Sequence, residues 1–125
     1  MKNFHSLTLE ERELVILTRE AIDSSGITTT EIGGRLGLAT GGVITHYRYG
    51  NSLLAQKHVN NFCELFHLNK KVFSLIWLRA INPNVYENII SSISADVVEK
   101  LELEIQRLRP IAEHEQKLAE MNSAA

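Results

Sequence analysis

The distribution of glycine is the sequence feature that most constrains this fold. All seven glycines lie between residues 26 and 50, and none follows Gly50. Glycine ends helices and permits tight turns, so this distribution predicts short helices joined by sharp turns in the first half and longer helices in the second. No segment alternates apolar and polar residues as a half-buried strand would. The sequence therefore predicts an all-α fold.

Several helix starts can be read from local signals. Thr8 and Thr28 each precede a glutamate by three residues, the capping-box pattern of a helix N-terminus. At Asn82-Pro83, asparagine can cap a helix and proline is favoured at its first position. Pro110 is expected to kink or divide the last helix. The expected helices cover about residues 8–25, 28–36, 40–47, 52–68, 70–81 and 83–92, with a seventh from residue 94 onward.

The segment over residues 28–47 predicts a helix-turn-helix, because two short helices are joined by a turn that contains glycine. Each glycine inside a helix costs about 1 kcal/mol, so the adjacent pair at 41 and 42 needs a reason. The interpretation we prefer is close approach of this backbone to DNA, and the alternative is tight packing between helices. In the second helix we expect Val43, Ile44 and Tyr47 to turn inward and Thr40, Gly41, Gly42, Thr45 and His46 to face outward.

These residues also carry a family resemblance. The motifs are AIDSSG at 21–26, TTTEIGGRLG at 28–37, LATGGVITHY at 38–47 and SLLAQ at 52–56. Residues 12–58 resemble the DNA-binding domain of TetR-family transcriptional regulators, and 36–54 is especially similar to the betaine-type repressors. Two departures are Gly33 for a usual small alanine and Gly50 where the family typically has a phosphate-contacting lysine.

The resemblance implies a domain organisation and a function. A TetR-like helix-turn-helix domain would occupy residues 1–50, and a short helical dimerisation and regulatory region residues 51–125. The protein would be a homodimeric repressor on a palindromic operator in double-stranded DNA. Base contacts are expected from Thr40, Gly42, Thr45 and His46, and phosphate contacts from Arg35, Arg48 and Lys57, with Tyr47 supporting the helix and touching a phosphate. The full set of candidate DNA contacts is Thr28, Arg35, Thr40, Gly41, Gly42, Thr45, His46, Tyr47, Arg48 and Lys57.

Two apolar patterns mark the C-terminal half. Val98, Leu101, Ile105 and Leu108 recur at heptad-like spacing, which predicts a dimer interface, because a chain this small would leave such a seam partly exposed. Phe62, Phe66, Phe73 and Trp77 form one helical stripe, which is either core or the lining of an apolar pocket. Phe73 and Trp77 are the candidate effector contacts.

Charge leaves a second function open. The chain has 13 Lys and Arg against 15 Asp and Glu, a formal net charge of -2, and residues 1–62 hold six of each class. No global basic field attracts nucleic acid. The alternative to DNA binding is therefore a protein-interaction module that binds and inhibits another regulator through its acidic C-terminal helices.

Other functional classes lack support in the sequence. No arrangement typical of a catalytic triad or a carboxylate pair stands out, so no enzyme and no cofactor is predicted. Cys63 and His67 share a helix face but lack a third ligand, so no metal site is predicted. A single cysteine suits a reducing cytosol, and no apolar run is long enough to span a bilayer, so we expect a cytoplasmic protein. His5, His58 and His114 are expected at the surface.

Overall fold

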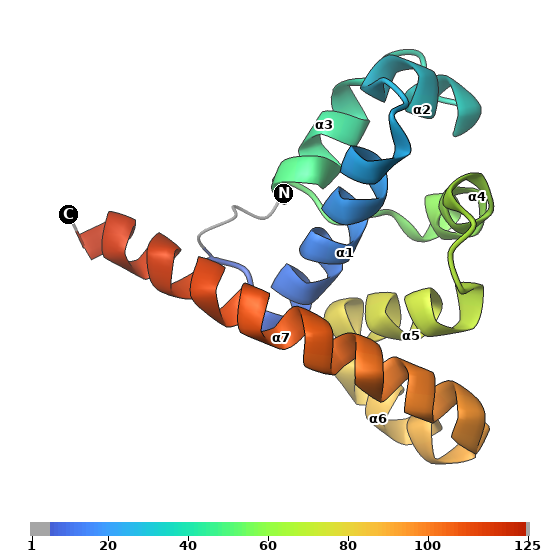
Figure 1. Ribbon diagram of the computed structural model, residues 1–125, viewed down its shortest axis with the longest axis vertical. Helices are drawn as coiled ribbons and strands as arrows, with labels where there is room; N and C mark the ends of the chain where they lie inside the picture. The colour runs from blue at the N-terminus through green and yellow to red at the C-terminus, as the bar shows by residue number, and fades with distance from the viewer. Residues whose placement is uncertain (1–5, 125) are drawn as a thin grey trace.

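The computed structural model describes residues 6–124, which leaves His5 outside the described part of the chain. These residues form helices and contain no strand, so the predicted all-α class is confirmed (Figure 1). A short 3₁₀ turn, Ile90–Ser92, lies between the last two helices. The helices are α1 (Leu9–Ser25), α2 (Thr29–Arg35), α3 (Gly42–Tyr49), α4 (Gln56–Phe66), α5 (Lys70–Ile81), α6 (Pro83–Ile89) and α7 (Ala95–Ala124).

The helix ends predicted from local sequence signals are confirmed at both ends of α1 and at the start of α6. The Thr8 hydroxyl accepts from the Glu11 backbone N–H at 3.1 Å, and the Glu11 carboxylate accepts from the Thr8 N–H at 2.9 Å. Gly26 ends α1 with a left-handed backbone at φ +71°. The Asn82 side chain accepts from the Val85 N–H at 3.2 Å, ahead of Pro83 in the first turn of α6. These boundaries follow from residues within one helical turn.

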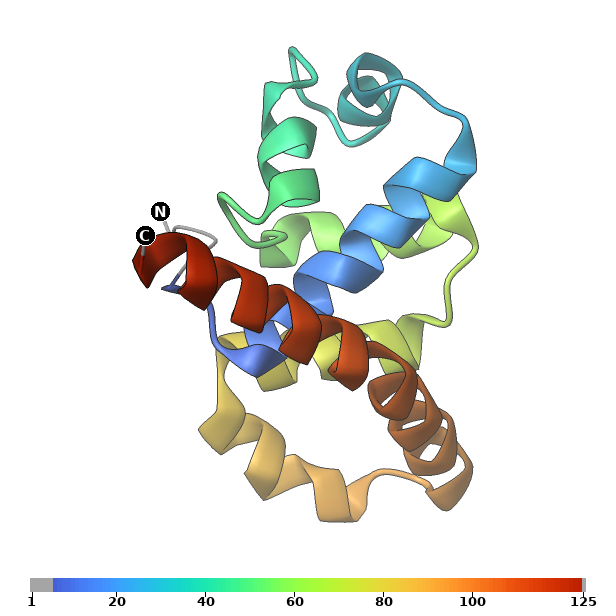
Figure 2. The same ribbon diagram turned by 60° about the vertical axis from the view of Figure 1, so that its left-hand side comes forward.

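One helix begins later than predicted, and the last helix is bent but not divided. α4 begins at Gln56 rather than near residue 52, because the Leu54 side chain is buried and its carbonyl accepts from the Trp77 indole N–H at 2.6 Å. The linker before α4 is thus held against α5. α7 continues through Pro110 without being divided, and Figure 2 shows that it changes direction in its middle part.

α1 is the central helix of the molecule. It contacts α3 on one side and α5 and α7 on the others, with α2 and α3 at one end of the molecule and α6 at the opposite end (Figures 1 and 2). One buried apolar cluster includes Leu14 of α1, Ile44 of α3, Phe62 of α4 and Leu101 of α7. Residues on both sides of position 50 therefore share a single core.

Charged side chains join α7 to α1 around that core. Arg19 pairs with Glu115, Arg107 with Glu20, and Arg109 with Glu13, each at 2.8 Å. The Glu13 side chain is fully buried and also pairs with Arg79 of α5. Glu13 is thus compensated by two guanidinium groups, as a buried carboxylate requires. Within residues 6–124, no helix is both long and apolar enough to cross a bilayer.

Candidate nucleic-acid interface

Two glycines set the distance between α2 and the start of α3. A Cβ at Gly33 would lie 2.5 Å from the Thr40 carbonyl oxygen, and one at Gly41 would lie 2.8 Å from the Thr29 carbonyl carbon. Real Cβ atoms essentially never approach so closely, so only glycine fits both positions. Tight packing between helices, the alternative interpretation, therefore accounts for Gly41, and approach of its backbone to DNA stays a prediction. A Cβ at Gly42 would meet only the Thr40 hydroxyl, at 3.5 Å, so the backbone of Gly42 remains approachable.

α3 presents an exposed stripe that packing does not use. Its inner side carries Ile44 and Tyr47, both buried in the core. We call the opposite side the outer face of α3. Its first member lies three and four residues before the two middle members, and its last lies four and three residues after them, so all four are neighbours on one side of the helix. The outer face of α3 consists of Gly42, Thr45, His46 and Tyr49, all exposed.

Exposure in and around α3 agrees with most of the predicted orientations. Thr40, Gly42, Thr45 and His46 are exposed, as expected, and Gly41 is half-buried against α2. Val43 was expected to turn inward and does not, because Ile44 and Tyr47 already fill the inner side; its side chain is 36% exposed. Tyr49, which is 51% exposed, was not among the predicted contacts, although its spacing from Thr45 and His46 could have indicated it.

Tyr47 is a structural anchor and not a DNA contact. Its hydroxyl lies 2.9 Å from Nδ1 of His58 and accepts from the Ala55 backbone N–H at 3.3 Å. Burial raises the pKa of Tyr47. The predicted phosphate contact is therefore wrong, because the hydroxyl is enclosed between α3 and α4. His58 is also buried, only 5% exposed, which corrects the expectation that it lies on the surface; His114 is exposed as expected.

The C-terminal end of α3 explains a departure from the TetR pattern. Gly50 ends the helix with a left-handed backbone at φ +75°, a conformation in which a lysine would be strained. The Arg48 carbonyl, one of the last in the helix, accepts from Nε of Arg19 at 3.0 Å. Because Arg19 also holds Glu115, the end of α3 is connected through α1 to α7.

The predicted phosphate contacts differ in their availability. Arg35 pairs with Glu31 at 3.1 Å, and Arg48 pairs with Asp23 at 2.8 Å. The Arg48 guanidinium also lies 5.4 Å from the centre of the Tyr49 ring. Lys57 is exposed on α4. The positive charge around the outer face of α3 is thus partly neutralised by the chain's own carboxylates.

Thr28 has a defined structural role at the start of α2. Its hydroxyl accepts from the Glu31 backbone N–H at 3.2 Å, which caps the helix. The residue is exposed, so its capping role leaves one side of the hydroxyl accessible. Thr28 directly precedes α2, which lies at the same end of the molecule as α3 (Figure 1).

The predicted dimer seam belongs largely to the core of the chain. Leu101 and Leu108 are 0% exposed, enclosed by the packing of α7 on α1 and α5, so their assignment to an interface is wrong. Val98 and Ile105 are half-buried, and Ile105 packs against the core. The exposed large apolar side chains of α7 are instead Leu103, Ile111, Leu118 and Met121.

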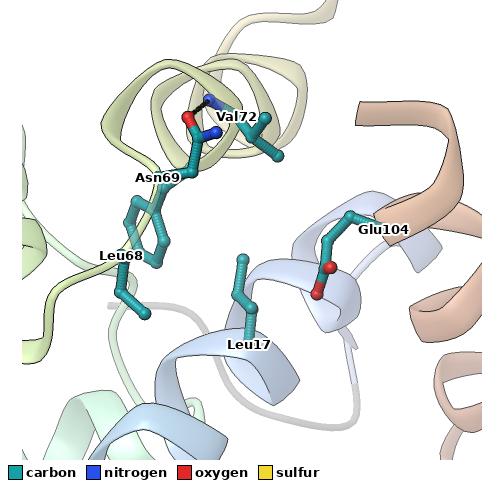
Figure 3. A pocket seen from close by; sticks show the side chains of 6 residues that line it. Leu17, Leu68, Asn69, Val72 and Glu104 are labelled. Atoms are coloured by element: carbon teal, nitrogen blue, oxygen red, sulfur yellow. Dashed lines mark hydrogen bonds between the residues drawn. The ribbon is translucent and has the colours of Figure 1, made fainter. Parts of the chain in front are cut away.

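The candidate effector residues do not share a cavity. Phe73 lines a small cavity of about 130 Å³ between α1, α5 and α7, together with Leu17, Leu68 and Glu104 (Figure 3). Small-molecule sites typically measure about 300–1,000 Å³, so this cavity is too small for such a ligand. Trp77 lies outside it and bonds to the linker before α4. Phe73 and Trp77 therefore do not line this cavity together.

Two further results complete the description of the site. Among residues 6–124, no group of three or more His, Cys, Asp or Glu side chains is placed to hold a metal ion. No protein-family model, curated protein or solved structure matches this chain. The function of this chain is therefore inferred from the geometry of α2, α3 and the residues that support them.

Proposed function

We propose that this protein is a sequence-specific DNA-binding regulator in which α2 and α3 act as a helix-turn-helix. The observation that carries the proposal is the outer face of α3. Its four residues are exposed, lie on one side of a short helix, and contribute nothing to the core. A major groove about 12 Å wide admits one α-helix, so this face can reach base edges.

The side chains on the outer face of α3 suit reading of bases. His46 offers ring nitrogens that donate and accept hydrogen bonds, and its exposure keeps both accessible. The Thr45 hydroxyl donates to the Gly41 carbonyl at 3.2 Å, which leaves its lone pairs and its methyl group for a base edge. Gly42 lets the backbone at the start of α3 come close to the DNA.

The charge distribution predicts a shallow salt dependence. Arg35, Arg48 and Lys57 are the proposed phosphate contacts, and two of them must exchange a carboxylate for a phosphate on binding. The slope of log K against log salt is about -0.9 for each phosphate neutralised. A dimer with three such groups per chain would thus give a slope of about -5 at most.

Selection from a pool of random-sequence duplexes tests this function. At low salt the protein is expected to enrich one motif, and His46→Ala is expected to relax base preference, since a good side-chain pairing to a base edge is worth about 1–3 kcal/mol of discrimination. Arg48→Ala is expected to weaken all sequences alike. Gln106→Ala, a change at an exposed, uncharged position of α7, is the control and should alter neither. Absence of any enriched motif would overturn the proposal.

The rest of the proposal concerns assembly. The TetR-like resemblance supports a cytoplasmic homodimer on a palindromic site and repression as the output. The apolar side chains available for pairing are those exposed on α7, since Leu101 and Leu108 are enclosed within the chain. Sedimentation equilibrium at micromolar concentration is expected to show twice the chain mass of 14.1 kDa. A stable monomer would contradict the dimer while leaving the DNA contact open to test.

A second function is favoured by one specific observation. On α7, the exposed apolar Ile111, Leu118 and Met121 lie among the exposed acids Glu113 and Glu120. Such a surface fits a protein partner that carries a basic and apolar face. In this alternative the protein inhibits another regulator through α7, and the outer face of α3 stays free of ligand.

A further inference from the structure

The contact between Tyr47 and His58 is the buried polar link between α3 and α4. Tyr47 comes from the inner side of α3, and His58 from the first turns of α4. Both side chains are buried, and their rings meet edge to face with centroids 6.0 Å apart. The pair therefore joins the helix that carries the proposed base contacts to the body of the molecule.

The donors and acceptors around the Tyr47 hydroxyl indicate where the protons of Tyr47 and His58 lie. The Tyr47 oxygen accepts from the Ala55 backbone N–H, a group that can only donate. Nδ1 of His58 lies 2.9 Å from the same oxygen. An N–H at Nδ1 would leave the phenol proton without an acceptor at this contact, so we assign Nδ1 as the acceptor of that proton, with the proton of neutral His58 on Nε2.

Protonation of His58 removes this arrangement. The incoming proton can occupy only Nδ1, which then becomes a donor facing the Tyr47 hydroxyl. The phenol would have to turn its own proton away from both N–H groups, into a buried site. A buried polar hydrogen without an acceptor costs about 1–3 kcal/mol, so the contact between α3 and α4 is weakened.

From this geometry we infer that His58 is a positioning residue for α3, and that it holds the outer face of α3 in place only while its imidazole is neutral. The inference rests on the proposed function and adds a pH dependence to it. Acid releases the Tyr47 anchor, so α3 loses its fixed position and DNA affinity falls.

The surroundings of His58 give the direction of the effect. Burial, followed by the positive charge of Lys57 on the same helix, lowers the pKa of His58. The Tyr47 hydroxyl of α3 faces His58. Trp77 of α5, which carries no charge, donates a hydrogen bond to the linker that precedes α4. The neutral form thus persists below the ordinary histidine pKa of about 6.5. The anchor is fully formed above that pH and is lost as pH falls through the lowered pKa.

Histidine NMR tests the inference without DNA. Long-range ¹⁵N–¹H correlation on the intact chain is expected to show the Nε2–H tautomer of His58 at pH 7.5, and its pKa is expected below the ordinary histidine value of about 6.5. An Nδ1–H tautomer would overturn the inference, because the phenol would then not donate to His58.

A matched pair of variants tests the coupling to α3. His46→Gln removes the imidazole that α3 itself carries, so the comparison uses His46→Gln with and without Tyr47→Phe, which removes only the buried hydroxyl. In His46→Gln, the amide resonances of α3 should shift with pH as His58 titrates. When Tyr47→Phe is added to His46→Gln, this pH-dependent shift should be absent. Equal titration of α3 in both proteins would contradict the inference.

DNA affinity supplies the functional readout. With the duplex selected from the random pool, the wild-type chain should lose at least about fivefold more affinity between pH 7.5 and 5.0 than Tyr47→Phe, since a buried polar hydrogen without an acceptor costs about 1–3 kcal/mol. Both proteins carry the same histidines, so the comparison isolates the Tyr47 hydroxyl. If neither protein binds DNA, the proposed function fails while the NMR result still decides the role of His58. Equal pH profiles in two proteins that bind would overturn the coupling.

Discussion

α3 and α7 use their apolar residues in opposite ways. α3 has eight residues, of which only Ile44 and Tyr47 are buried in the core, so packing does not use its outer face. α7 has 30 residues, and its regularly spaced Leu101 and Leu108 are buried by packing within the chain. Periodic apolar residues in a long helix therefore identify the chain's own core, whereas the residues that packing leaves unused in a short helix identify the candidate interface.

The largest effect should come from the enclosed leucines of α7. Leu101→Ala is expected to lower the free energy of unfolding by about 2–5 kcal/mol, because it opens a cavity in the core. Leu103→Ala, two residues away and 59% exposed in the wild type, should change it by less than about 0.5 kcal/mol. Urea unfolding measures both, and Leu101→Val gives a milder version if alanine abolishes folding. A fall in oligomeric mass with unchanged stability would restore Leu101 to the interface.

A smaller effect is expected where α2 meets the start of α3. Gly33→Ala should destabilise the chain by about 1–3 kcal/mol, as in overpacked sites, because its Cβ would lie 2.5 Å from the Thr40 carbonyl oxygen. Gly34→Ala is the control, since nothing lies within 4 Å of its Cβ, and it should stabilise the helix by up to about 1 kcal/mol. Thermal unfolding of the two variants measures the difference. Equal stability would mean that α2 and α3 are further apart than described.

Sequence reasoning succeeded where a signal is local and failed where it depends on what lies opposite. Thr8, Gly26 and Asn82 determine helix ends through contacts within a few residues, so those ends were predictable. The spacing of Leu101 and Leu108 shows that one side of a helix is covered, but not whether the same chain covers it.

The role of His58 shows the same limit more sharply. Its partner Tyr47 lies eleven residues earlier, on another helix, and no periodicity connects the two. A single histidine therefore looked like a surface residue until its neighbours were placed. For Gly50 the pattern indicated a missing phosphate-binding lysine, whereas its positive φ shows a helix end.

The smallest effect concerns the charge that surrounds the outer face of α3. Asp23→Asn frees Arg48 from its 2.8 Å ion pair and should raise affinity for every duplex by up to about fivefold, the limit set by an exposed pair of about 0.2–1 kcal/mol. Glu113→Gln removes the same charge from exposed α7 and should have a smaller effect. Fluorescence anisotropy at fixed salt compares them. Equal gains would mean that only net charge matters and that Arg48 is not a phosphate contact.

The most direct test of the central claim is an amide NMR footprint of the selected duplex on the full chain. DNA binding through the outer face of α3 predicts that the resonances of Thr45, His46 and Tyr49 shift or broaden on titration, while those of Leu118 and Met121 on α7 stay unchanged. Shifts confined to α7, or none at all at low salt, would contradict the account.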